Sequence, residues 1–270
     1  MDQRLGREQL REVSGAGFDA IELFALRTHV DYHNESAIAD LQQELAAACV
    51  VLDSVHAPVS EGVTAGRWGA SLNLASPDDA SRQHAVDETL RALHIARRLP
   101  FSVLVVHPGV ARAQQQTPAD NNRDAARRSI ETIVKAAEPL GVTVAVELIP
   151  NALSKPESLV HFIEDVLETG AASICLDLGH AHLGGDVVDA IETVSEHIAA
   201  VHAHDNRGRE DDHLLPFEGT IDWPAALTTL QKVGYEAPIV LEIAARGSVP
   251  VRLAAVPTAR RRMERLLTTL

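Results

Sequence analysis

Metal-capable side chains recur along this chain at the ends of apolar segments. They are His56, His107, Glu147, Asp177, His202 and Glu242. The three carboxylates interrupt runs that are otherwise apolar, where charged residues are uncommon. Carboxylates that lie close together repel one another strongly unless a cation lies between them. The residue types therefore predict a divalent-cation site, provided that the fold brings the segment ends together.

Further potential donors follow the same segments in the sequence: His180, Asp211 and His213. His204 comes two residues after His202, so both can face the same side of one strand. His204 therefore stays an alternative to His202 as the ligand. Glu22 is interpreted either as a substrate contact or as an ion pair inside a barrel. Trp68, in a glycine-containing stretch, is interpreted either as a lid over a ligand or as a loop anchor.

Seven apolar segments carry these residues and are predicted to be strands: 18–24, 50–56, 101–107, 142–148, 172–178, 198–205 and 238–243. Most are almost continuously apolar, which is typical of parallel strands covered on both faces. Helical segments lie between them. This alternation predicts an α/β fold around one parallel sheet.

The fold class that fits best is a (β/α)8 TIM barrel with its first strand apparently missing from this chain. The pattern supplies seven strands and eight helices, and a helix over residues 5–14 comes first. We expect a short apolar strand ahead of residue 1 to complete the barrel. No linker interrupts the pattern, so residues 1–270 are expected to form one domain. In such a barrel the carboxyl ends of the strands converge on one mouth, where active sites form.

Composition narrows the functional classes. Hydrophobic residues make up 46% of the 270 residues, and the net charge is −14. This charge disfavours nucleic acid and anionic membranes as partners. No apolar run reaches membrane-spanning length, and from the first residues we expect no signal peptide. Cys49 and Cys175 are predicted to be buried free thiols, which fits a reducing cytoplasm.

The motifs together resemble those of the xylose isomerase-like barrel superfamily. They are SVHAP (54–58), VVHPG (105–109), VELIPN (146–151), CLDLGHAH (175–182), VHAHDNRG (201–208), DDHLLPFEGTIDW (211–223) and LEI (241–243). The resemblance runs from about residue 16 to 243, and the superfamily's first strand is the feature that this chain lacks. The superfamily holds sugar isomerases and epimerases, inosose dehydratases and endonuclease IV-type apurinic endonucleases.

The resemblance implies a single-metal site with Glu147, Asp177, His202 and Glu242 as ligands. His202 is preferred because residues 202–205 fit the superfamily's His-x-x-Asp strand end. Glu147 and Glu242 would also act as the acid/base pair. The residues expected to hold the substrate are His180, His204, Arg207 and Trp68. The cofactor would be Mn, Zn, Co or Mg, with no nucleotide cofactor.

The predicted function is a divalent-metal-dependent sugar or sugar phosphate isomerase or epimerase, with proton transfer through a metal-stabilised enediolate. An inosose dehydratase-like lyase and a non-catalytic sugar-binding barrel are alternatives. A further alternative is a trinuclear-zinc apurinic endonuclease-like phosphodiesterase, whose additional ligands would be His56, His107, His180, Asp211 and His213. The expected partner is a small-molecule sugar, and a homodimer stays open.

Overall fold

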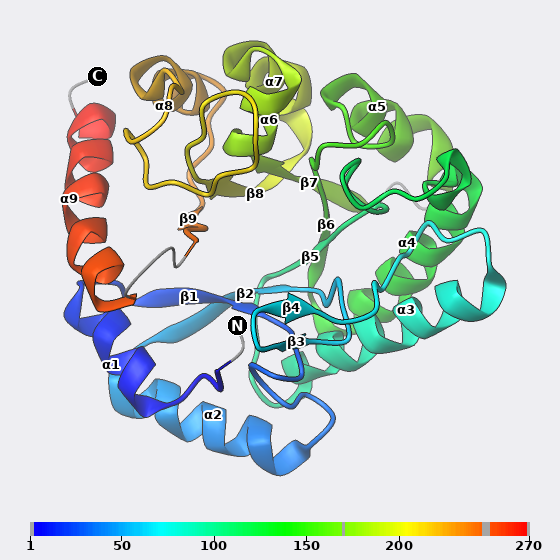
Figure 1. Cartoon of the computed structure of the whole chain (residues 1–270), viewed down its shortest axis with the longest axis horizontal. Coiled ribbons are helices and arrows are strands. Elements are labelled where there is room, and N and C mark those ends of the chain that lie inside the picture. Colours follow the sequence, from blue (N-terminus) through cyan, green and yellow to red (C-terminus); the bar gives the residue numbers. More distant parts are fainter. Residues whose placement is uncertain (1–2, 169–170, 245–248, 269–270) are drawn as a thin grey trace.

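Seven parallel strands form a single curved sheet that surrounds the centre of the molecule (Figure 1). The computed structural model describes residues 3–168, 171–244 and 249–268. The strands, in sheet order, are β1 (Ala20–Phe24), β2 (Val51–His56), β5 (Val103–Val106), β6 (Thr143–Glu147), β7 (Ala172–Asp177), β8 (Ile198–Ala203) and β9 (Ile239–Leu241). All seven lie within the predicted segments, so the predicted barrel class is confirmed.

Helices cover the outside of this sheet (Figure 1). They are α1 (Arg7–Gly15), α2 (Glu35–Ala48), α3 (Asp79–Leu93), α4 (Arg123–Ala137), α5 (Pro156–His161), α6 (Leu178–Gly184), α7 (Val187–Val194), α8 (Trp223–Lys232) and α9 (Val249–Thr268). Eight helices were predicted, and the described part of the chain contains nine α-helices. Between helices and strands lies a continuous aliphatic core that includes Leu104, Ile130 and Ile174.

A small hairpin follows β2 and was not predicted. Its strands are β3 (Val63–Thr64) and β4 (Arg67–Trp68), which pair in antiparallel fashion. The turn between them places Ala65 and Gly66 at φ 50° and 71°. Glycine adopts such a conformation at no steric cost, so Gly66 favours the tight reversal. Trp68 therefore lies on a hairpin and not in an irregular loop.

The sheet is open at one seam. β1 pairs with β2 and β9 pairs with β8, but β1 and β9 are not neighbours in the described sheet. Between them lies a cavity of about 720 Å³, whose lining includes Phe18, Ile239 and Met263. The helix α9 packs along this seam and buries Met263. The expected strand ahead of residue 1 stays a prediction.

The two cysteines differ in their surroundings. Cys175 is a free, buried thiol on β7, as expected. Cys49 is also free but is exposed, so its predicted burial is wrong. It ends α2 in a left-handed conformation, at φ 54°, which turns the chain toward β2. No helix in the described part of the chain has the length and apolar character needed to span a membrane.

Candidate metal centre

Four predicted ligands meet at the mouth of the barrel. Glu147 ends β6, Asp177 ends β7, His202 lies near the end of β8 and Glu242 directly follows β9. Strand register brings them to one level, because Asp177 pairs with His202 across β7 and β8. One ligand atom from each of the four lies within 4.8 Å of the others.

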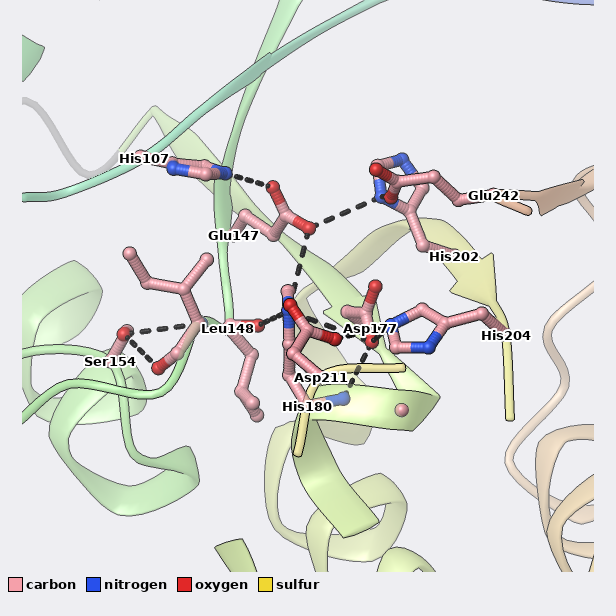
Figure 2. Close-up of polar contacts among 12 residues, drawn as sticks. His107, Glu147, Leu148, Ser154, Asp177, His180, His202, His204, Asp211 and Glu242 are labelled. Carbon is pink, nitrogen blue, oxygen red and sulfur yellow. Dashed lines mark hydrogen bonds and ion pairs between the residues drawn. The ribbon is translucent and has the colours of Figure 1, made fainter. Parts of the chain in front are cut away.

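Glu147 is the centre of this arrangement, with its side chain 1% exposed. Its Oε2 lies 3.0 Å from His56 Nε2 and 2.8 Å from His107 Nε2. Its Oε1 lies 3.2 Å from His202 Nδ1 and 3.8 Å from His180 Nδ1. Figure 2 shows the carboxylate reaching toward His107 on one side and His202 on the other. A carboxylate surrounded by four imidazoles can share its two oxygens between neighbouring cation positions.

His202 connects Glu147 to Glu242. Its Nδ1 lies 3.1 Å from Glu242 Oε2, and the His202 side chain is fully buried. The opposite ring nitrogen, Nε2, lies 3.1 Å from Oε1 of Glu22 on β1. The two glutamates at the mouth therefore approach the same nitrogen of one imidazole, which places both carboxylates at one small volume.

Asp177 has two roles: it caps a helix, and it is one of the four clustered donors. Its Oδ1 accepts a hydrogen bond of 2.7 Å from the backbone N–H of His180, which caps the start of α6. Ser, Thr, Asn and Asp favour this capping position because a short side chain can reach the free N–H groups of the first turn. The second oxygen, Oδ2, is buried and has no hydrogen-bond partner within the described structure.

A second group of donors lies beside the first: His180, His204, Asp211 and His213. Backbone carbonyls fix two of its imidazoles, because Nδ1 of His180 donates to Leu148 O and Nδ1 of His213 donates to Glu242 O. Their Nε2 atoms then lie 3.1 and 3.3 Å from Asp211 Oδ2. His204 is fully buried and stacks on His213, with ring centroids 3.9 Å apart.

The mouth carboxylates are strongly biased toward their charged form. Burial alone would raise the pKa of Glu147, but the positive charges of His107 and His202 outweigh it and hold the pKa well below its usual range. Burial opposes ionisation of Glu242 too, yet the hydrogen bond with His202 lowers its pKa to about 2. Glu147 and Glu242 are therefore ionised at neutral pH and available as ligands.

Two imidazoles of the second group, those of His180 and His213, are biased toward the protonated form. Burial lowers the pKa of His180, but the charge of Asp177 and the hydrogen bond with Asp211 outweigh it and raise the pKa to about 10. Burial and Asp211 compete in the same way at His213, whose pKa rises to about 9. In these surroundings a proton and a cation would serve the same purpose, which is to neutralise clustered carboxylates.

The donor set suits a divalent cation. Three carboxylates and one imidazole match the oxygen-rich sites of Mn²⁺ or Mg²⁺, while the imidazole-rich second group matches Zn²⁺. Buried polar atoms are normally hydrogen-bonded. Asp177 Oδ2 and Nδ1 of His204 have no such partner among the described residues, and Nε2 of His204 has only ion-pair contacts, with Asp177 Oδ1 at 3.1 Å and with Asp211 Oδ1 at 3.6 Å. Asp177 and His204 belong to the two donor groups, so the residues present fit a cation better than a purely hydrogen-bonded core.

The remaining predicted substrate residues lie at the rim. Trp68 is 52% exposed, and its ring lies edge-on to Phe24 at 6.4 Å. Phe24 in turn contacts the ring of His56 at 4.4 Å. Arg207 is exposed on the loop after β8. The hairpin therefore places an aromatic pair beside the first donor group.

Asp205 is a positioning residue that the sequence showed only as the last member of the His-x-x-Asp motif. It is fully buried, and its carboxylate accepts from Trp223 Nε1 at 2.8 Å and from Phe217 N at 3.0 Å. It also accepts from the backbone N–H of Ile221. These bonds tie down the loop that carries Asp211. With the backbone N–H of Asn206, four N–H groups donate to this carboxylate. The sequence spacing did not predict these contacts.

The comparisons with known proteins agree with this architecture. A protein of Methanocaldococcus jannaschii, MJ1311, is 29% identical over 241 residues, which are 86% of this chain and 77% of that protein. The L-ribulose-5-phosphate 3-epimerase UlaE of Salmonella paratyphi A is 25% identical over 245 residues, with 87% and 81% covered. The crystal structure of a D-tagatose 3-epimerase-like protein superposes with a TM-score of 0.78 at 26% identity and covers 100% of this chain and 99% of its own.

The family model described as xylose isomerase-like TIM barrel matches residues 10–267, which is nearly the whole chain. That range includes every strand of the sheet and every donor of both groups. By sequence and by fold, the chain belongs to the xylose isomerase-like TIM-barrel family.

Proposed function

We propose that this chain is a divalent-metal-dependent epimerase or isomerase of a sugar or sugar phosphate. The observation that carries the proposal is the pair Glu147 and Glu242, whose oxygens lie 3.2 and 3.1 Å from the same nitrogen of His202. Two ionised carboxylates on either side of one cation position are suited to proton transfer on both faces of a bound sugar. The similarity to sugar 3-epimerases supports the same chemistry.

Each residue has a role in this proposal. A cation held by Glu147, Asp177, His202 and Glu242 would polarise the carbonyl and the adjacent hydroxyl of a ketose. One of the two glutamates takes the proton from the carbon next to that carbonyl, and the other returns a proton to the opposite face. The substrate would be held by His180, His204, Arg207 and Trp68. Trp68 and Phe24 supply an apolar wall against the sugar ring.

The test combines turnover with isotope exchange. Purified protein loaded with Mn²⁺ or Co²⁺ is incubated in D₂O with ketoses that include L-ribulose 5-phosphate and D-tagatose. We expect one solvent deuteron at the epimerised carbon. The variants Glu147→Gln and Glu242→Gln should each lose about 10²–10⁴-fold in kcat/KM. The control is Glu131→Gln, a helix-surface carboxylate paired with Arg127. Full turnover in both mouth variants would contradict the assignment.

The second donor group favours one other function. Besides the four predicted ligands, the mouth holds the second donor group and a further group formed by His56, His107 and Glu147. Several adjacent cation positions are what a trinuclear phosphodiesterase would need. The net charge of −14 opposes the approach of a nucleic acid, although bound cations can reverse the local potential. Elemental analysis of protein purified without a chelator separates the two functions. One metal per chain supports the epimerase, whereas two or three zincs per chain call for an assay on abasic-site DNA.

A further inference from the structure

Glu22 on β1 reaches into the barrel on the inner side of His202. Its side chain is 7% exposed. Its two oxygens lie 3.1 and 3.2 Å from Nε2 of His202, so the carboxylate straddles that edge of the ring. Ser54 on β2 donates a hydrogen bond of 2.8 Å to Oε2 of Glu22 and fixes the carboxylate in place. The contact joins β8 to β1, two strands that are not neighbours in the sheet.

The two nitrogens of His202 therefore face different partners. Nδ1 faces the oxygens of Glu147 and Glu242 at the mouth, whereas Nε2 faces Glu22. A ring nitrogen can bind a cation only through a lone pair, and the hydrogen bond of the other nitrogen decides which one keeps it. A carboxylate at Nε2 holds a proton there, so that the proton a cation displaces is the one on Nδ1 and the lone pair set free is directed toward the mouth.

Glu22 itself is on the wrong side of the ring to act as a ligand at the mouth. The four-donor group whose atoms lie within 4.8 Å of one another contains His202 but, among the described residues, not Glu22. Its oxygens instead approach the nitrogen that points away from Glu147. This separation distinguishes a residue that orients the ligand from one that binds the ion.

We propose that Glu22, held by Ser54, is the positioning residue that fixes the ring orientation and tautomer of His202 for cation binding. The proposal rests on the proposed function and deepens it, since it assigns a residue that lies outside the mouth. Removing the carboxylate partner of a metal-binding histidine costs about 10–100-fold in metal affinity. Ser54→Ala should give a smaller loss, because Glu22 keeps its contact with Nε2 but loses its own anchor.

The experiment measures cation affinity directly. Mn²⁺ binding to metal-free protein is followed by calorimetry for the parent chain and for Glu22→Gln, Glu22→Ala and Ser54→Ala. We expect the Kd to rise by about 10–100-fold in Glu22→Ala and by less in Glu22→Gln, which keeps an acceptor oxygen. The visible spectrum of the Co²⁺-loaded protein should also shift in both Glu22 variants. A purely structural effect would lower the unfolding midpoint of the metal-free protein and leave that spectrum unchanged.

A matched control exists outside the barrel. Glu164 contacts Nε2 of His197 at 2.9 Å, so Glu164→Gln removes the same kind of carboxylate–imidazole contact at the surface. It should leave the Mn²⁺ affinity unchanged. Parent-like affinity and Co²⁺ spectrum in both Glu22 variants would overturn the positioning proposal but leave the epimerase proposal intact. An affinity loss in a protein that epimerises none of the sugars would support Glu22 and count against the epimerase. If the parent chain binds no Mn²⁺, both proposals fail.

Discussion

His204 occupies its place because residue 179 has no side chain. A Cβ atom built on Gly179 would lie 2.0 Å from Cε1 of His204 and 2.4 Å from both ring nitrogens. Real Cβ atoms essentially never approach so closely, and the His204 ring is fully buried with little room to move. The glycine therefore permits the stacking of His204 on His213 and the assembly of the second donor group.

The variant Gly179→Ala should destabilise the protein, because the new methyl group forces the His204 ring out of its packed position. Overpacking of this kind costs about 1–3 kcal/mol. Gly184 lies in the same short helix α6, and a Cβ there meets no atom within 4 Å. Gly184→Ala should therefore be neutral or slightly stabilising. Chemical unfolding of both variants measures the difference, and equal midpoints would contradict the steric explanation.

The residues of the candidate site could be predicted from their types, but the contacts between them could not. Carboxylates inside apolar strands were visible in the sequence, as were His202 and His204 on one strand. Which imidazole nitrogen faces which carboxylate depends on strand register and on ring rotation. The sequence also left Glu22 open between a substrate contact and an ion pair. The structure shows it 3.1 Å from His202 Nε2, inside the barrel.

At the scale of the elements, the long strands were predictable and the short pieces were not. Near-continuous apolar runs identify buried parallel strands because both faces are covered. The hairpin β3–β4 has two residues per strand, too few to give any periodicity. Cys49 looked buried because its neighbours are apolar. It lies at the left-handed end of α2, where the backbone turns its side chain toward solvent.

One buried carboxylate ties α3 to the loop that follows β1. Glu88 accepts from the hydroxyl of Tyr32 at 2.7 Å and lies 2.8 Å from His33 Nε2. Arg91 lies 3.5 Å from its other oxygen. Burial alone would raise the pKa of Glu88, but the hydrogen bonds with Tyr32 and His33 outweigh it and lower the pKa below its usual value.

This arrangement predicts a pH-dependent contribution to stability. A carboxylate with a depressed folded-state pKa stabilises the fold above its unfolded pKa of about 4.3, and the contribution is lost as the pH falls through the folded value. At pH 7, Glu88→Gln should lower the free energy of unfolding by about 1–3 kcal/mol. The difference from the parent chain should shrink between about pH 4.5 and pH 3. Urea unfolding of the parent chain and of Glu88→Gln across this pH range measures the difference in unfolding free energy. A difference that does not change with pH would count against a stabilising role of the Glu88 charge.

At the scale of the whole molecule, the open seam leaves the described sheet with two edge strands, β1 and β9, that pair on one side only, while the central strands pair on both sides. β6 and β7 have a neighbour on each side, whereas β9 is three residues long and pairs only with β8. We expect native-state hydrogen exchange to show faster exchange in β9 than in β6, because an edge strand opens with fewer contacts broken. Mass spectrometry of peptic fragments resolves the two strands. Equal protection would mean that the seam is closed in solution.

The seam also lies beside the site, since Glu242 directly follows β9 and Glu22 lies on β1. The contact between Glu22 and His202 and the hydrogen bond from Arg260 on α9 to the backbone of Gly17 are polar connections in this region. These contacts therefore help to hold β1 in relation to β8 and to α9 on the far side of the seam.

The capping of α6 by Asp177 bears on how fast a cation can enter. The bond to His180 N fixes the carboxylate through Oδ1, and its other oxygen, Oδ2, is buried with no hydrogen-bond partner in the described structure. Little conformational entropy then remains to be lost on association. For a cation that binds there, we expect the slow step to be removal of water from the ion and not rearrangement of the protein. That step discriminates against Mg²⁺, which gives up its hydration reluctantly. With the carboxylate held in advance by the helix cap, we expect the rate at which an ion loses its water, as well as its affinity, to select the metal.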